Sequence, residues 1–221
     1  MIDEWPSTPD EAVALQLRMA PLVDPHPPAD FRPATAAGLD VAYDERSDRL
    51  FAAVVVLDLA SLETVDQAVV PGVTDFPYVP GLFAFRELPA LLAALERLTV
   101  SPDLLICDGQ GVAHPRRFGL ASHLGVVTGL PSVGVAKTPM GHYDPPGPER
   151  GDWTALRDGN DVVGRALRAQ PAVKPLFVSI GHRTDLDTAC AQVLRLAPKY
   201  RQPETTRRAD RLCRDALTSG S

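Results

Sequence analysis

Three apolar, β-prone runs follow one another closely in the first third of the chain, and their spacing limits the possible folds more than any other feature. The runs are Ala36–Tyr43, Leu50–Leu59 and Thr64–Val70, and the polar turn Asp44–Asp48 separates the first two. Connections this short suit antiparallel neighbours, because parallel strands need a crossover of a dozen or more residues. The sequence therefore predicts three strands joined as antiparallel hairpins.

After the third run, helical and strand-like patterns alternate. Leucines recur at helical spacing from Leu88 to Leu98, so a helix begins close to Arg86, with Pro89 tolerated near its start. The other segments that we predict are a strand over 102–108, a helix over 118–128, a strand over 132–136, a loop over 138–151, strands over 162–167 and 176–180, and helices over 185–197 and 205–217. This order predicts an α/β fold with a mixed sheet, three antiparallel strands followed by alternating helices and strands, flanked by helices. It matches the ribonuclease H-like arrangement.

The chain has 221 residues and is 45% hydrophobic, which is enough to bury a substantial core. We expect one domain over 1–221, in which residues 1–34 form a short N-terminal helix and a proline-rich lead-in. The three cysteines are far apart and form no CxxC pair, so neither a disulfide framework nor a zinc site is supported. Neither a secretory leader nor a membrane-length apolar run is recognisable, so we expect a cytoplasmic protein without a membrane partner.

The net charge of −6 argues against a protein that coats nucleic acid through a broad basic surface. It does not exclude a nuclease, because clustered active-site carboxylates add negative charge that a divalent metal neutralises. Local basic pairs, Arg116-Arg117 and Arg207-Arg208, remain available to meet phosphates.

Two aspartates interrupt runs that are otherwise apolar. Asp40 lies within Gly38–Ala42, and Asp108 ends the run that begins at Leu104. A carboxylate inside a buried sheet is destabilising unless something pairs with it. Mg²⁺ prefers hard oxygen ligands and often uses one or two protein carboxylates together with water and substrate phosphate. The two aspartates are therefore a candidate metal site; the alternative is that each caps a strand end or pairs with an arginine.

Two further acids lie beside apolar helix faces. Glu87 stands at a predicted helix start, next to the leucine stripe, so its side chain can point inward. The alternative for Glu87 is a surface acid that stabilises the helix dipole. Asp210 lies between Ala209 and Leu212 in the last helix, where its flanking arginines also allow an ordinary surface salt bridge.

Tyr78 lies in a loop whose backbone is restricted by Pro77 and Pro80. A rigid aromatic tip suits a wedge between bases, and it suits equally well an anchor that holds the loop to the core.

Four more residues are candidates for contact with a substrate. Gly109 and Gly111 follow Asp108 directly and allow a ligand to approach the backbone closely. His114 precedes Pro115-Arg116-Arg117, and Lys137 follows a predicted strand; either side chain can meet a phosphate.

Taken together, several blocks of this sequence resemble the endonuclease V family. The matching blocks are GLDVAYD (38–44), PYVPGLFAFRE (77–87), PDLLICDGQGVAHPRRFGLASHLG (102–125), SVGVAKT (132–138), SIGHR (179–183) and RQPETTRRADRLCRDA (201–216). They cover most of the chain from Gly38 onward, and the third block is long and highly specific. The resemblance implies a ribonuclease H-like fold that hydrolyses a phosphodiester on the 3′ side of a deaminated base.

The resemblance also implies a role for each candidate residue. The family's metal-binding carboxylates fall on Asp40 and Asp108, its catalytic glutamate on Glu87, and its C-terminal acidic or histidine position on Asp210. Its phosphate-side lysine falls on Lys137.

The family's remaining motifs concern substrate binding. Its wedge motif falls on five consecutive residues with the tyrosine at the tip: Pro77, Tyr78, Val79, Pro80 and Gly81. The glycine-rich backbone around Gly109 and Gly111 falls where the family holds the flipped base.

These expectations combine into one predicted activity. It is a Mg²⁺-dependent DNA repair endonuclease, with Mn²⁺ able to substitute, that nicks DNA at the second phosphodiester bond 3′ to a deaminated base such as hypoxanthine. The ends left are 3′-hydroxyl and 5′-phosphate. Inosine-containing RNA is a second candidate substrate, and a monomer is expected. The competing interpretations are a non-catalytic module that recognises deaminated bases and a broader structure or mismatch nuclease.

Overall fold

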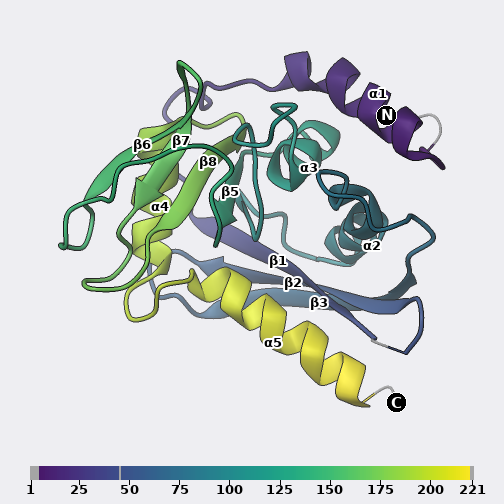
Figure 1. Ribbon diagram of the computed structural model, residues 1–221. Coiled ribbons are helices and arrows are strands. Elements are labelled where there is room, and N and C mark those ends of the chain that lie inside the picture. Colours follow the sequence, from purple (N-terminus) through teal and green to yellow (C-terminus); the bar gives the residue numbers. More distant parts are fainter. Residues whose placement is uncertain (1–4, 45, 220–221) are drawn as a thin grey trace.

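The computed structural model describes residues 5–44 and 46–219, which form one eight-stranded sheet with helices on both faces (Figure 1). The strands are β1 (Thr35–Tyr43), β2 (Arg49–Asp58), β3 (Thr64–Val73), β4 (Leu105–Cys107), β5 (Ser132–Ala136), β6 (Trp153–Asp158), β7 (Asp161–Leu167) and β8 (Leu176–His182). The helices are α1 (Pro9–Met19), a short 3-10 helix (Ala20–Leu22), α2 (Ala84–Glu96), α3 (Leu120–Thr128), α4 (Leu186–Leu196) and α5 (Glu204–Ser219). Glu45, within the predicted turn 44–48, lies outside the described residues, as do 1–4 and 220–221.

The sheet is mixed, as the sequence predicts. Its strand order is β3-β2-β1-β4-β5-β8-β7-β6. β1, β2 and β3 pair antiparallel, β4 runs parallel to both β1 and β5, and the last three strands pair antiparallel. The three antiparallel strands and the flanking helices are therefore confirmed.

β6 is the strand that the sequence patterns do not predict. Only Leu156 is buried along it, so the alternation of apolar and polar residues that marks a half-buried strand is missing. β6 pairs with β7 through a tight turn around Gly159, whose φ is +60°. The run Asp158-Gly159-Asn160 is a hairpin signal of the kind that could have indicated it.

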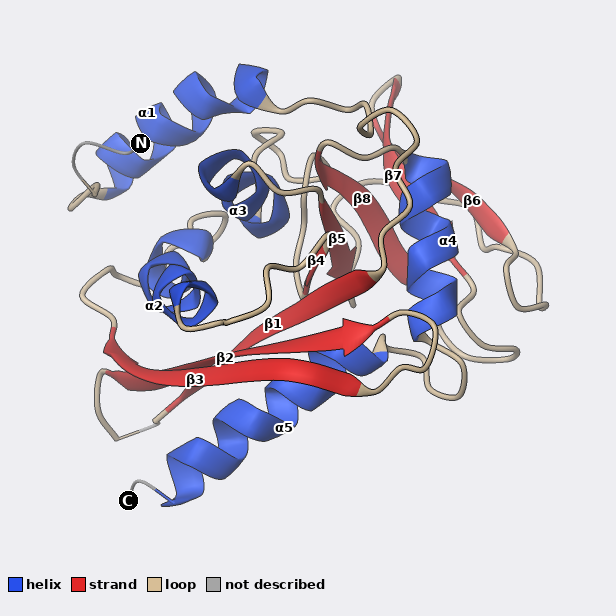
Figure 2. Cartoon of the chain, turned by 180° about the vertical axis from the view of Figure 1, so that it is seen from behind, coloured by secondary structure: helices blue, strands red, loops and turns tan. Residues whose placement is uncertain are grey.

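The two faces of the sheet are covered by different helices (Figure 2). On one face, Ala37 and Leu39 of β1 pack with residues of α2 and α3. On the other face, Ala36 packs with residues of α4 and with Ala209 of α5. Side chains alternate along a strand, so Asp40 shares the face of Ala36 and points toward α5.

α5 crosses β1 very closely. A Cβ atom added to Gly38 would lie 2.1 Å from the backbone carbon of Thr205, a distance that no side chain can accommodate. Glycine at this position therefore allows the start of α5 to lie directly on β1, two residues before Asp40.

α1 belongs to the folded core. Ala12, Leu15 and Met19 pack with apolar residues that include Phe76 and Leu82. The helix begins at Pro9, because Thr8 caps it and Glu11 completes the capping box. Among residues 5–44 and 46–219, none of the helices has the length and apolar character that a membrane crossing requires.

Candidate active site

Asp40 and Asp108 lie side by side because of the register between two parallel strands. Leu39 of β1 is opposite Cys107 of β4, and β4 ends there. Asp40 is the next residue of β1, Asp108 directly follows β4, and neighbouring strands are about 4.8 Å apart. The carboxylates of Asp40 and Asp108 are therefore neighbours at the point in the sheet where the central strand β4 ends.

Burial and neighbouring acids raise the pKa of Asp40. Loss of solvent has the largest effect, followed by the charges of Asp108 and Asp210 and by a hydrogen bond with the Asp210 side chain, and together they raise the pKa from 3.8 to about 7. A hydrogen bond between two carboxyl groups requires a shared proton. The crowding of carboxyl groups therefore favours the binding of a proton or of a cation at this site.

Glu87 enters the same cluster from α2, on the other face of the sheet. Its side chain is only 6% exposed, and the Tyr43 hydroxyl donates a hydrogen bond of 3.3 Å to Glu87 Oε1. Burial, and then the charge of Asp40, raise the pKa of Glu87 to about 8. The helix-start acid thus points inward, and the alternative of a solvated surface acid is wrong.

Asp210 lies on α5 at the rim of the cluster. Its Oδ1 accepts a hydrogen bond of 2.7 Å from Arg214 Nε, so the surface salt bridge foreseen as the alternative is also present. Cys213, one turn further on, donates to the Asp210 carbonyl and lies 3.8 Å from Asp40 Oδ2. Burial raises the pKa of the Cys213 thiol to about 12, so this thiol is protonated near neutral pH.

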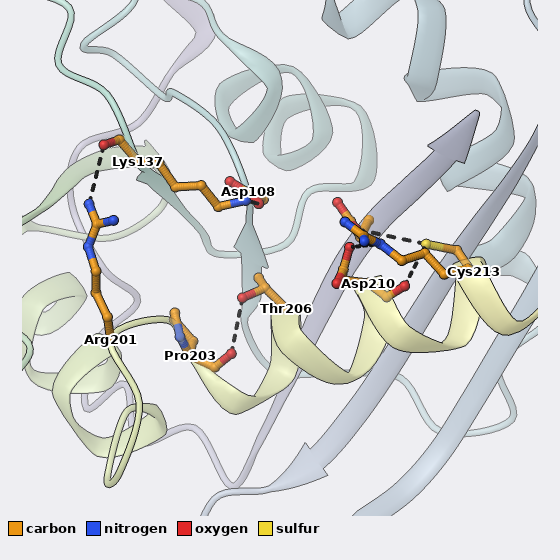
Figure 3. A network of polar contacts seen from close by, with 9 residues as sticks. Asp108, Lys137, Arg201, Pro203, Thr206, Asp210 and Cys213 are labelled. Atoms are coloured by element: carbon orange, nitrogen blue, oxygen red, sulfur yellow. Dashed lines mark hydrogen bonds and ion pairs between the residues drawn. The ribbon is translucent and has the colours of Figure 1, made fainter. Parts of the chain in front are cut away.

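Lys137 supplies the positive charge at the site. It follows β5, and its Nζ donates a hydrogen bond of 2.5 Å to Asp108 Oδ2 (Figure 3). Arg201 donates to the Lys137 carbonyl at 3.3 Å and to the Pro175 carbonyl at 2.7 Å. The Lys137 side chain is 50% exposed, so its ammonium group is accessible to a phosphate.

The acid cluster fits a hard divalent cation, which the sequence predicts to bind Asp40 and Asp108. Its oxygen donors are adjacent, and the charges of Asp108 and Asp210 on Asp40 are the kind of repulsion that a bound cation relieves. Throughout the described part of the chain, no three acidic, histidine or cysteine side chains converge closely enough to form a metal cage alone. Binding of a metal by Asp40 and Asp108 stays a prediction.

A pocket of about 530 Å³ adjoins the acids. Its lining includes eight of the predicted site residues: Tyr78, Val79, Pro80, Gly81, Asp108, Gly109, His114 and Lys137. The volume lies within the range of small-molecule sites, about 300–1,000 Å³. A group held in the pocket would therefore lie next to the carboxylate of Asp108.

An exposed aromatic pair forms the rim of this pocket. Tyr78 is 72% exposed, and its ring meets that of Phe83 edge-on at 6.4 Å. Phe83 also contacts Tyr43, which bonds Glu87. Because Tyr78 points into solvent, the interpretation that it anchors its loop to the core is wrong.

Two predicted contact residues, Gly111 and His114, have roles within the fold. The Gly111 N–H donates to Ser179 Oγ at 2.9 Å, and a Cβ on Gly111 would lie 1.9 Å from the Ile180 carbonyl oxygen. His114 is buried, and its Nε2 lies 2.9 Å from the Gly81 carbonyl oxygen. Pro77 lies between Phe76 and Tyr78. Contact of these residues with a substrate stays a prediction.

The structure adds residues that sequence reasoning missed. Tyr43 and Phe83 join the site through contacts described above, and Arg201 supports Lys137. Gln110 lines the pocket, where its Nε2 donates to the Thr138 carbonyl at 3.0 Å and its Oε1 has no partner among the described residues. A polar residue between Gly109 and Gly111 was the available signal for Gln110.

The mixed sheet, with acids gathered where its central strand ends, defines a nuclease of the ribonuclease H-like class. The model of the family described as Endonuclease V matches residues 18–211. The chain belongs to the endonuclease V family.

Comparisons with individual proteins agree with this assignment. An endonuclease V from Streptomyces avermitilis is 59% identical over 217 residues, covering 96% of this chain and 94% of that relative. The crystal structure of an endonuclease V from the same organism has a TM-score of 0.92 and 56% identity, covering 98% of this chain and 96% of the other. An endonuclease V from Ciona intestinalis, solved with a 24mer DNA containing an inosine followed by a ribo-adenosine, has a TM-score of 0.84 at 27% identity, covering 96% of this chain and 98% of that chain.

Proposed function

We propose that this protein is a metal-dependent endonuclease that nicks DNA at the second phosphodiester bond 3′ to a deaminated base, with hypoxanthine as its main target. The cut leaves 3′-hydroxyl and 5′-phosphate ends and initiates repair. The observation that carries the proposal is the position of the carboxyl cluster beside a pocket with an exposed aromatic rim. The complex of the Ciona relative with inosine-containing DNA supports the choice of substrate.

Asp40 and Asp108 are the residues proposed to hold Mg²⁺, with Mn²⁺ able to substitute. When bound, the cation would activate a water molecule and stabilise charge on the phosphate and the leaving 3′-oxygen. Asp210 lies at the rim, where its hydrogen bond with Asp40 allows it to take part in holding the ion or its water. Lys137 lies against Asp108 and would neutralise a phosphate oxygen.

Glu87 is proposed to hold a proton at the centre. Its Oε1 accepts the Tyr43 hydroxyl hydrogen, which leaves Oε2 for the reacting water. Its pKa, raised to about 8, suits a group that exchanges a proton near neutral pH. Tyr43 would then orient the carboxyl group without contacting the substrate.

Selection of the damaged base follows from the cost of extrusion and from the pocket. A deaminated base pairs weakly, so turning it out of the duplex costs less than turning out a normal base. Tyr78 would fill the gap that the base leaves, as aromatic and apolar side chains do when they insert between base steps. Asp108 lines the pocket, so a base seated there would place the adjoining backbone near the acids.

Strand cleavage of matched, end-labelled oligonucleotides tests this proposal. DNA and RNA strands with one inosine or none are incubated with Mg²⁺ or with EDTA, and Asp40→Ala serves as the inactive control. We expect a Mg²⁺-dependent nick one nucleotide beyond inosine in DNA, and an Asp40→Ala protein that binds but does not cut.

Each other outcome has a defined meaning. Binding of inosine DNA without cleavage under any condition would support a recognition module. Equal cleavage of inosine, mismatched and undamaged strands would support a broader nuclease. Preferential cleavage of the RNA strand would overturn the choice of DNA, because the two are distinguished at the 2′-hydroxyl.

A further inference from the structure

The carbonyl oxygen of Gly81, in the loop that carries Tyr78, accepts hydrogen bonds from three side chains. Gln16 Nε2 lies 3.1 Å away, His114 Nε2 2.9 Å and Arg116 Nη2 2.7 Å. His114 Nδ1 accepts from the Arg116 backbone N–H, so Nε2 carries the ring hydrogen and donates. A carbonyl oxygen has two lone pairs, so three donors saturate it. We call this arrangement the Gly81 clamp.

The clamp depends on glycine at its centre. Gly81 has a φ of +80°, in the left-handed region. A Cβ atom there would lie 2.8 Å from Arg116 Nη2 and 3.3 Å from His114 Nε2. The backbone conformation and the close approach of the donors are therefore linked.

Gln16 of α1 is the member of the clamp that comes from farthest away in the sequence. Its Nε2 also donates to the Phe118 carbonyl at 3.0 Å, and its Oε1 accepts from Arg116 Nε at 2.5 Å. A guanidinium only donates and a carbonyl only accepts, so the orientation of the Gln16 amide is determined. The residue is 1% exposed, and every hydrogen-bonding group of its side chain is used.

α1 holds the same loop through apolar contacts. Its buried residues Leu15 and Met19 share a cluster with Phe76 and Leu82, which stand on either side of Tyr78 in the sequence. The loop is thus fixed at both ends and at the Gly81 carbonyl, while Tyr78 at its tip remains exposed.

We propose that Gln16 is a positioning residue for base extrusion, and that α1 is therefore part of lesion recognition. This inference rests on the proposed function. An extruded base leaves a gap that closes again unless the inserted side chain resists, so the loop beneath Tyr78 must be stiff. Gln16 provides stiffness by joining that loop to α1 and to Arg116. It precedes the residues matched by the family model, which begin at 18.

The substrate form separates this role from a merely structural one. An inosine in duplex DNA must be extruded and held out, whereas an inosine in a single strand is already unpaired. If the loop that carries Tyr78 becomes less rigid, cleavage of the duplex should slow while cleavage of the single strand stays nearly unchanged. Damage to the acids or to the fold as a whole would slow both.

The experiment measures single-turnover cleavage of the same inosine strand, alone and in duplex, by the full chain. Gln16→Met keeps the volume and removes all three hydrogen bonds. Gln16→Glu keeps the contact with Arg116 but loses both donated bonds. Thr8→Ala is the matched control, because it removes the cap of α1 at an exposed position and leaves the clamp intact. All assays are run below the melting transition of every variant.

We expect both Gln16 variants to lose about tenfold in rate on the duplex, because each loses the hydrogen bond from Gln16 to the Gly81 carbonyl that holds the loop. Their rates on the single strand should stay within about twofold of wild type, as should both rates of Thr8→Ala. Equal losses on the two substrates, or no loss on either, would overturn the inference. A wild-type protein that cuts neither substrate would instead remove the proposed function.

Discussion

Replacing Asp40 by asparagine should stabilise the metal-free protein while abolishing its activity. Burial and the charges of Asp108 and Asp210 raise the pKa of Asp40 from 3.8 to about 7. A tenfold change in proton affinity corresponds to about 1.4 kcal/mol, so ionising this group costs the fold about 4 kcal/mol above pH 7. Asparagine removes that charge, although Asp108 and Asp210 remain close to one another. We therefore expect a net gain of about 2 kcal/mol, or about 6 °C in melting temperature for a chain of this length.

The gain should depend on pH in a defined direction. Below about pH 4 the carboxyl group is protonated in the folded and the unfolded chain, so the substitution changes little. As the pH rises from 4 to 7, the unfolded carboxyl ionises while the folded one resists, and the wild type loses stability throughout this window. The advantage of Asp40→Asn should therefore be full at pH 8 and only about a third as large at pH 5.

Thermal unfolding in EDTA at pH 5 and pH 8, repeated with Mg²⁺ at pH 8, provides the measurement. Mg²⁺ should stabilise the wild type more than the variant, because a cation that binds the folded state adds to its stability. Asp30→Asn is the control, since it removes one negative charge from an exposed position. A melting temperature of Asp40→Asn that falls in EDTA at pH 8, or a gain equal at both pH values, would refute the argument.

Three other substitutions have distinct expected effects. Lys137→Ala should lower the rate of single-turnover cleavage by about 100-fold, because it removes the positive charge beside Asp108. The melting temperature of the protein should hardly change, because the Lys137 side chain is half-exposed, and a large thermal shift would contradict this. Gly111→Ala should destabilise the fold by about 3 kcal/mol in urea unfolding, because the new Cβ would meet the Ile180 carbonyl oxygen, and unchanged stability would count against the packing argument. Tyr78→Ala should weaken binding of inosine duplex about tenfold in fluorescence anisotropy without changing stability, and equal affinity would exclude a wedge.

The sequence predicts the sheet and the central acids because both leave local signals. Asp40 and Asp108 are charged residues in apolar runs, and a buried carboxylate needs a functional or ionic partner wherever the strand lies. The strand β5 has the predicted bounds, Ser132 to Ala136, because all of its residues are buried and apolar or small. β6 lacks such a signal, because Leu156 is the one buried residue of this edge strand and its other residues are exposed or partly exposed.

The rest of the site depends on long-range contacts that have no local pattern. Gln16 is a polar residue on the buried face of a helix, and nothing in α1 itself shows that its partners are Gly81, Arg116 and Phe118. The hydrogen bond that holds the Glu87 carboxyl group similarly comes from Tyr43, a residue on another element. These hydrogen bonds join residues more than 40 positions apart in the sequence, so the local spacing of residues does not reveal them.

The short length of β4 explains how acids from opposite faces of the sheet reach one centre. β4 has three residues and stops at Cys107, while β1 continues to Tyr43, so the sheet lacks its central strand beyond Leu39. Through that opening Glu87 of α2 approaches from one face, and Asp210 of α5 approaches from the other. A longer β4 would pair with β1 at Asp40 and separate the two helices by a continuous sheet. Gly38 contributes by letting α5 lie on β1, so the geometry of the acids rests on a strand end and a glycine as much as on the acids themselves.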